Sequence, residues 1–125
     1  MEIKDQSNEI VKIRYRLRVC IRKNVDELKE FGINVDLKGD NISTLELNRY
    51  ITKIVGRFRD MLKKYDIECP RAIDESFVED LKNSEEFEKI SEQDRNYINS
   101  SFLKLAIKSR EGKTIEDNSI SPTSY

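Results

Sequence analysis

The chain lacks several residue types on which common catalytic sites depend. It contains no histidine and no tryptophan, and only four glycines, two prolines and two cysteines in 125 residues. Without histidine, catalytic triads built on an imidazole base and metal sites with imidazole ligands lose their central group. The glycines stand alone, so they form neither a phosphate-binding loop nor a dinucleotide-binding fingerprint. These absences predict a protein that is not an enzyme.

Long apolar runs are absent too. None approaches the ~18 residues that a membrane-spanning helix needs, and residues 1–9 lack the apolar segment of a secretory signal. The two cysteines, Cys20 and Cys69, lie far apart in the sequence, as expected for free thiols in a reducing compartment. We therefore expect a cytoplasmic protein without a membrane partner.

The composition is that of one small, highly charged domain. The chain has 23 Lys and Arg and 24 Asp and Glu, and hydrophobic residues make up 37% of it. A chain of this length can build one hydrophobic core, provided that its apolar residues are concentrated there. We expect a single domain over residues 1–112. Residues 113–125 have no apolar periodicity, which is typical of a disordered C-terminal tail.

The clearest element is a helix that begins after Ser43. Ser43 and Glu46 form a capping box, in which the hydroxyl and the carboxylate each satisfy a free backbone donor. Pro70 is consistent with a helix end near residues 65–67. The apolar positions recur at helical spacing and form one broad face: Leu47, Tyr50, Ile51, Ile54, Val55, Phe58, Met61, Leu62 and Tyr65.

The C-terminal third contains signals for further helices. A helix is expected over residues 74–82, and two later start signals begin at Asn83 and Ser91. Gly112 is placed to cap the C-terminus of the last helix. Between residues 91 and 110, apolar positions cover more than half of the helix circumference and predict a well-buried helix: Ile98, Phe102, Leu103, Leu105, Ala106 and Ile107.

Two structures are compatible with the N-terminal third. Apolar and mostly basic residues alternate from position 11 to 22, which is typical of a strand, so residues 10–21 and 31–37 can form a two-stranded sheet. Asn24 can open a short helix between the two strands, and Gly32 can close it. The same segment also carries a helical stripe that starts after Ser7: Ile10, Ile13, Leu17, Cys20, Ile21, Leu28 and Phe31.

We favour the helix, because its stripe includes residues that the strand interpretation must place elsewhere. The predicted fold class is therefore mainly α, a single-domain helical bundle of about four to five helices. The alternative is an α+β fold in which the small N-terminal sheet, residues 10–21 and 31–37, packs on helices.

Charge is divided between the two halves of the chain. Residues 10–64 carry 14 Lys and Arg against 7 Asp and Glu, whereas residues 71–125 carry 8 against 12. The basic half can bind a nucleic-acid backbone by replacing its counterions. The competing interpretation is a solvated helix face, which the net charge of −1 favours. The candidate nucleic-acid contacts are Arg14, Arg16, Arg18, Arg49, Lys53, Arg57 and Lys64.

Two patterns resemble metal or acid–base sites without meeting their requirements. Glu75 and Glu79 lie one helical turn apart, but nothing in this acidic stretch is apolar enough to bury them. Asn34 and Asp36 resemble the start of a calcium loop, but Lys38 occupies a ligand position. We therefore expect no metal and no catalytic residue.

These patterns predict a small, non-enzymatic interaction or regulatory protein that binds another macromolecule. Its simplest form is self-association, as an oligomer paired along its long helices like a coiled coil. The helical interpretation leaves a second apolar stripe uncovered, so we expect the interface at Val11, Tyr15 and Val19. The alternative is a nucleic-acid-binding accessory protein that uses the basic residues. We expect a protein partner or a second copy, and neither a cofactor nor a small-molecule substrate.

Overall fold

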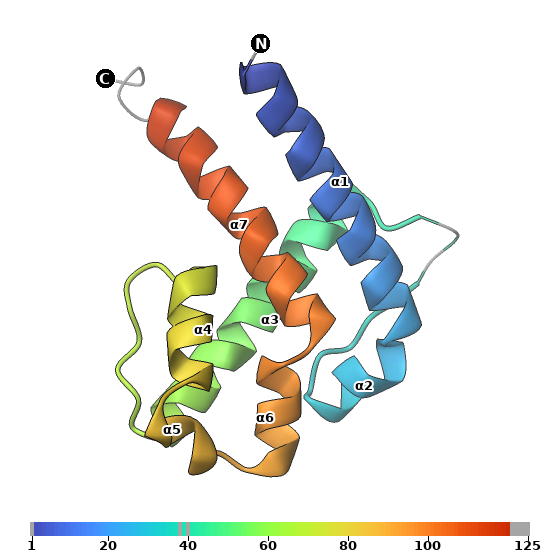
Figure 1. Ribbon diagram of the computed structural model, residues 1–125. Coiled ribbons are helices and arrows are strands. Elements are labelled where there is room, and N and C mark those ends of the chain that lie inside the picture. The colour runs from blue at the N-terminus through green and yellow to red at the C-terminus, as the bar shows by residue number, and fades with distance from the viewer. Residues whose placement is uncertain (1, 38, 40, 121–125) are drawn as a thin grey trace.

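The protein is a bundle of α-helices (Figure 1). The computed structural model describes the backbone of residues 2–37, 39 and 41–120, and the side chains of residues 8–37, 39 and 41–110. The predicted mainly helical class is confirmed. Within the described residues there are seven helices and no strand: α1 (Glu2–Lys23), α2 (Val25–Glu30), α3 (Thr44–Lys64), α4 (Glu75–Lys82), α5 (Glu85–Glu88), α6 (Glu92–Ile98) and α7 (Ser101–Ile120).

The alternative N-terminal sheet is wrong. Residues 10–21 lie within α1, and residues 31–37 form a turn followed by an irregular segment. Leu17, Cys20 and Ile21 are buried on one side of α1, as helical spacing requires, whereas a strand would place Cys20 on the basic face. The alternation is misleading because α1 also carries apolar residues on its outer face.

Three long helices form the centre of the bundle. Helix α7 contacts both α1 and α3, and α3 passes behind α1 and α7 in Figure 1. The short helices α4, α5 and α6 lie around the C-terminal part of α3, and α2 follows α1 at the lower end of the same view. The largest fully buried side chains come from α1, α2, α3, α6 and α7, and include Leu17, Leu28, Ile54, Phe58, Tyr97, Phe102 and Ile107.

Helix α3 follows its sequence pattern closely. The Ser43 hydroxyl accepts a hydrogen bond from the N–H of Glu46 at 3.1 Å and donates one to the Glu46 carboxylate at 3.0 Å. The predicted apolar stripe is buried except for Tyr65, which is half-buried. The Tyr97 hydroxyl donates to the carbonyl of Ile54 at 2.6 Å and fastens α6 to α3. Helix α3 is therefore a fixed scaffold for the surface that it presents.

Two segments interrupt helices that the apolar pattern predicts to be continuous, and this raises the helix count. Helix α1 ends before Asn24, whose side-chain N–H donates to the carbonyl of Cys20 at 2.8 Å, and α2 begins at the next residue. Helix α6 ends at Ile98, and the Ser100 hydroxyl accepts from the N–H of Leu103 at 3.3 Å where α7 begins. Asn and Ser favour such breaks because their side chains bond to the nearby backbone.

The last helix extends further than the sequence pattern predicts. Helix α7 continues through Gly112 to Ile120, so the prediction that Gly112 ends this helix is wrong. Glycine weakens a helix interior by about 1 kcal/mol relative to alanine, but it does not by itself fix a helix end. Residues 121–125 lie outside the described residues, and the disordered tail over residues 113–125 stays a prediction.

Helices α2 and α3 end in the same kind of left-handed turn. After α2, Gly32 has a φ of +81°, and the N–H of Ile33 reaches back to an α2 carbonyl at 2.9 Å. After α3, Asp66 has a φ of +55°, and the N–H of Ile67 reaches back to an α3 carbonyl at 2.8 Å. Glycine adopts this conformation freely, whereas a residue with a Cβ atom is strained in it.

We predict that Asp66→Gly raises the free energy of unfolding by about 0.5–1 kcal/mol, because it removes the strain of the left-handed turn. Urea unfolding followed by circular dichroism measures the change. The matched control is Gly32→Ala, which introduces the same strain after α2 and should lower stability by about 1 kcal/mol. A destabilising Asp66→Gly would contradict the prediction.

Candidate functional site

Large exposed apolar side chains lie on the outer faces of α1 and α3. Val11 is 62% exposed and Tyr15 is 66% exposed on α1, and Leu45 is 64% exposed in the first turn of α3. Val19, the third residue of the predicted interface, is half-buried. The structure therefore leaves two of the three predicted residues open to solvent and adds Leu45 to them.

Two arginines hold α1 against the start of α3. Arg14 donates a hydrogen bond from Nη2 to Oδ1 of Asn48, and Arg18 donates from Nε to the carbonyl of Ile42 at 2.8 Å. Arg18 Nη2 also lies 3.4 Å from the hydroxyl of Thr44. These side chains cross from α1 to the start of α3 and link the two, and we call the line of these bonds the seam.

The exposed apolar residues lie on both sides of this seam. Val11 and Tyr15 are within one helical turn of Arg14, and Leu45 is within one turn of Asn48. A shallow hollow of about 310 Å³ on α3 is lined by Leu45, Asn48, Arg49, Thr52 and Lys53. We call the residues Val11, Tyr15, Leu45, Asn48 and Thr52 the α1–α3 surface.

Leu45 is the candidate that the apolar pattern misses. It lies on the polar side of α3, opposite the buried stripe, where periodicity predicts a solvated residue. One exposed leucine is common on protein surfaces and is a weak signal on its own. Its position within one turn of Asn48, to which Arg14 of α1 is bonded, follows only from the folded chain.

The seven predicted nucleic-acid contacts are not equivalent in the structure. Arg16, Arg49 and Lys53 are exposed, and Arg49 and Lys53 are one turn apart on α3. The other four are half-buried or bonded within the protein: Arg14, Arg18, Arg57 and Lys64. Much of the predicted cationic surface therefore serves the fold.

A buried carboxylate joins the end of α3 to the start of α6. Asp94 is 5% exposed, and its Oδ2 accepts from the Tyr65 hydroxyl at 2.6 Å and from Nζ of Lys64 at 3.3 Å. The N–H of Asp94 donates to the hydroxyl of Ser91, which caps α6. Sequence reasoning identified this cap but missed the links to α3, which cross 29 and 30 residues of chain.

These contacts change the acidity of Asp94 and Lys64. Burial acts to raise the pKa of Asp94, but the hydrogen bonds from Tyr65 and Lys64 outweigh it, so the pKa lies below its usual value. The hydrogen bond to Asp94 raises the pKa of the Lys64 ammonium. Both groups are therefore charged and paired at neutral pH, which is typical of a structural link between helices.

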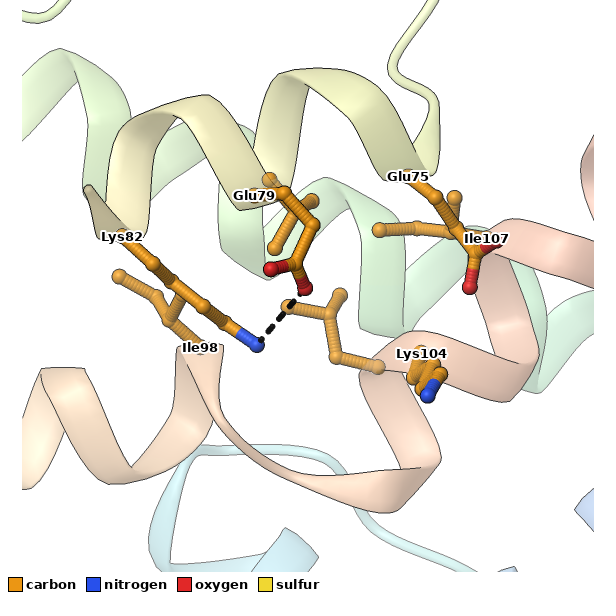
Figure 2. A pocket seen from close by; sticks show the side chains of 8 residues that line it. Glu75, Glu79, Lys82, Ile98, Lys104 and Ile107 are labelled. Carbon is orange, nitrogen blue, oxygen red and sulfur yellow. Dashed lines mark ion pairs between the residues drawn. The ribbon is translucent and has the colours of Figure 1, made fainter. Parts of the chain in front are cut away.

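Glu75 and Glu79, the acidic pair on α4, each form an ion pair with a different lysine. Glu79 lies 3.7 Å from Nζ of Lys82, and Glu75 lies 3.5 Å from Nζ of Lys108 on α7. In Figure 2, Glu79 points toward Lys82 while Glu75 lies at the other end of the helix. The cavity between α4 and α7 has a volume of about 20 Å³, enough for one water molecule. This site holds neither paired carboxylates nor room for a substrate.

A polar hollow of about 350 Å³ lies between the segment before α3 and α3 itself. The Tyr50 hydroxyl accepts from the N–H of Asp36 at 3.1 Å, which fixes one side of the hollow. The hollow is also lined by Arg49 and Lys53, whose positive charges repel a calcium ion at Asp36. The lining is Asn34, Asp36, Glu46, Arg49, Tyr50 and Lys53. Among the side chains that the structure describes, no three of His, Cys, Asp or Glu are grouped to hold a metal ion.

Both cysteines are free and packed within the fold. Cys20 is buried, which raises the pKa of its thiol. Cys69 is half-buried, and its Sγ atom accepts from Nη1 of Arg59 at 3.1 Å. Arg59 also donates to the carbonyl of Arg71 at 3.1 Å, so it holds the segment after α3 against this helix.

Comparison with family models, with curated proteins and with solved structures finds no match for this chain. No helix in the described part of the chain combines the length and the apolar character needed to cross a lipid bilayer. Function is therefore inferred from the chemistry of the α1–α3 surface.

Proposed function

We propose that this is a non-enzymatic interaction protein that binds another macromolecule through the α1–α3 surface. The observation that carries the proposal is the exposure of Val11, Tyr15 and Leu45 on two helices that are bonded together. Burying a large apolar side chain contributes roughly 1.5–3 kcal/mol relative to leaving it exposed. A partner that covers all three therefore gains a substantial part of its binding energy from them.

The first partner to test is a second copy of the chain. Light scattering behind a sizing column should then give a mass above the 14.7 kDa of one chain. Tyr15→Asp should return the mass to that of the monomer, because it places a charge in the interface. A wild-type monomer at high concentration would remove self-association.

Affinity capture from the cells that produce the protein tests the wider proposal. The bait is the full chain, and the matched control is the triple variant Val11→Ser, Tyr15→Ser, Leu45→Ser, which changes exposed positions only. We expect at least one macromolecule that the wild-type chain captures and the variant does not. If both baits capture the same molecules, the α1–α3 surface is not the binding site.

Nucleic-acid binding is the second candidate, and the exposed Arg49 and Lys53 favour it. If a DNA or RNA duplex binds, the logarithm of its affinity should fall linearly with the logarithm of salt concentration. Arg49→Ala with Lys53→Ala should reduce that slope by about 2, since each phosphate contact contributes about 1. Lys89→Ala, which removes an exposed cation after α5, is the control. No binding at low salt would remove this candidate.

A further inference from the structure

The α1–α3 surface lies in a strongly cationic part of the chain. Residues 8–23 and 41–53 together contain eight Lys and Arg against two Asp and Glu. One of the two carboxylates, Glu46, is bonded to Ser43 in the cap of α3. Asp36 also lines a hollow with Glu46, Arg49 and Lys53. A partner on this surface therefore meets apolar side chains among charges that are mostly positive.

The cations lie in line with the apolar residues. On α1, Val11, Tyr15, Arg18 and Arg22 follow at the spacing of one helix face, over about 16 Å of helix axis. Arg18 is half-buried and bonded to the carbonyl of Ile42, whereas Arg22 is exposed at one end of this line. On α3, the exposed Arg49 and Lys53 line the same hollow as Leu45.

This charge pattern opposes a symmetric dimer through the same surface. In a two-fold interface each patch meets its own copy, so the cationic region of one chain would face that of the other. Like charges brought together in an interface oppose association. Self-association through this face therefore lacks the charge complementarity that a different partner can provide.

We propose that the α1–α3 surface binds an acidic amphipathic helix of another protein. The inference rests on the proposed function and names the chemistry of the partner. The apolar face of the helix covers Val11, Tyr15 and Leu45, and its carboxylates lie near Arg22 and Arg49. About three helical turns are enough to follow the line along α1.

A protein helix fits these residues better than a nucleic acid does. Val11 and Leu45 are aliphatic side chains, which gain little from contact with a phosphate backbone. Arg14 and Arg18, the basic residues nearest the seam, already hold α1 on α3. An apolar centre with charged residues around it is typical of helix recognition between proteins.

Selection from a displayed library of helical peptides, with no bias in net charge, tests the inference. The bait is the full wild-type chain, and enriched peptides are measured by fluorescence anisotropy against wild type, Tyr15→Ser and Leu45→Ser. We expect enriched peptides to carry net negative charge and spaced apolar residues. Each serine variant should weaken binding about tenfold or more, as for residues at the centre of an interface.

Charge reversal gives the decisive comparison. Arg22→Glu with Arg49→Glu should weaken binding of an enriched acidic peptide at least about tenfold, and replacing the peptide's glutamates with lysine should restore it. Lys89→Glu, an exposed position after α5, is the matched control and should have little effect. All variants are made in the full chain, and circular dichroism of each variant checks that its fold is intact.

The outcomes separate this inference from the proposed function. Enriched peptides that depend on Tyr15 and Leu45 but are neutral or basic would overturn the acidic partner and leave the proposed function standing. If no enriched peptide depends on Tyr15 and Leu45, both the acidic partner and the proposed function are overturned. A DNA duplex that displaces the peptides, and whose own binding depends on Leu45, would also overturn the inference in favour of nucleic acid.

Discussion

Phe58→Ala is expected to lower the free energy of unfolding by about 3–5 kcal/mol. Phe58 lies in the middle of the buried stripe of α3 and is 0% exposed. Its ring meets that of Phe77 edge to face, with 6.3 Å between the ring centres. Removing the ring loses its transfer energy and leaves a cavity, because the surrounding helices are fixed by other contacts.

Urea unfolding followed by circular dichroism measures this effect. Domains of this size are typically stable by about 5–15 kcal/mol, so Phe58→Ala can leave little folded protein. Phe58→Leu, which keeps most of the volume, should lose less than about 1.5 kcal/mol and remain measurable. A loss below about 1 kcal/mol for Phe58→Ala would mean that the α3 stripe is not the core.

The second large effect is expected at Asp94, whose carboxylate links α3 to α6. Asp94→Ala should lower the free energy of unfolding by about 2–3 kcal/mol, because it removes two hydrogen bonds to a charged group in a buried position. Glu92→Ala is the matched control on the same turn. Glu92 is exposed, so its replacement should change stability by less than about 0.5 kcal/mol.

The contribution of Asp94 should depend on pH. Its pKa is lowered in the folded protein, so the stability it supplies is present above the unfolded value of about 3.9 and is lost as the pH falls through the folded value. The difference in unfolding free energy between wild type and Asp94→Asn should therefore shrink between pH 7 and about pH 3. A difference that stays constant over this range would show that the charge of Asp94 is not responsible.

Local signals in the sequence are sufficient for much of the fold. The cap at Ser43 marks the start of α3, and the apolar stripe repeats at helical spacing along its 21 residues, so the sequence predicts this helix. The N-terminal segment is harder, because its apolar residues alternate in a way that fits either period. The burial of Leu17 and Ile21 on one side distinguishes the helix from the strand. This burial depends on the contact of α1 with α7, which lies more than 75 residues away in the sequence.

Helix breaks are less predictable than helices. The apolar pattern continues across Asn24 and Ser100, so periodicity alone indicates unbroken helices. The choice between continuing and turning depends on what the new helix can pack against. After Asn24, the turn places Leu28 in the core with 0% exposure, which a straight extension of α1 does not guarantee.

The candidate site is predictable only in part. Val11 and Tyr15 follow from the outer stripe of α1, because helical geometry leaves them opposite the core. The contribution of Leu45 is not visible in the sequence, because it depends on the bonds from Arg14 and Arg18 to the start of α3. The same bonds explain why those two arginines are poor candidates for phosphate contacts, although their charge predicts them.

Photo-crosslinking in the producing cells tests the central claim most directly. A photoreactive amino acid replaces Tyr15 in one variant, Leu45 in a second, and Asp80, which is exposed on α4, in a control. We predict the same crosslinked partner from positions 15 and 45 and none from position 80. Crosslinks from position 80 alone, or no crosslink from positions 15 and 45, would contradict binding through the α1–α3 surface.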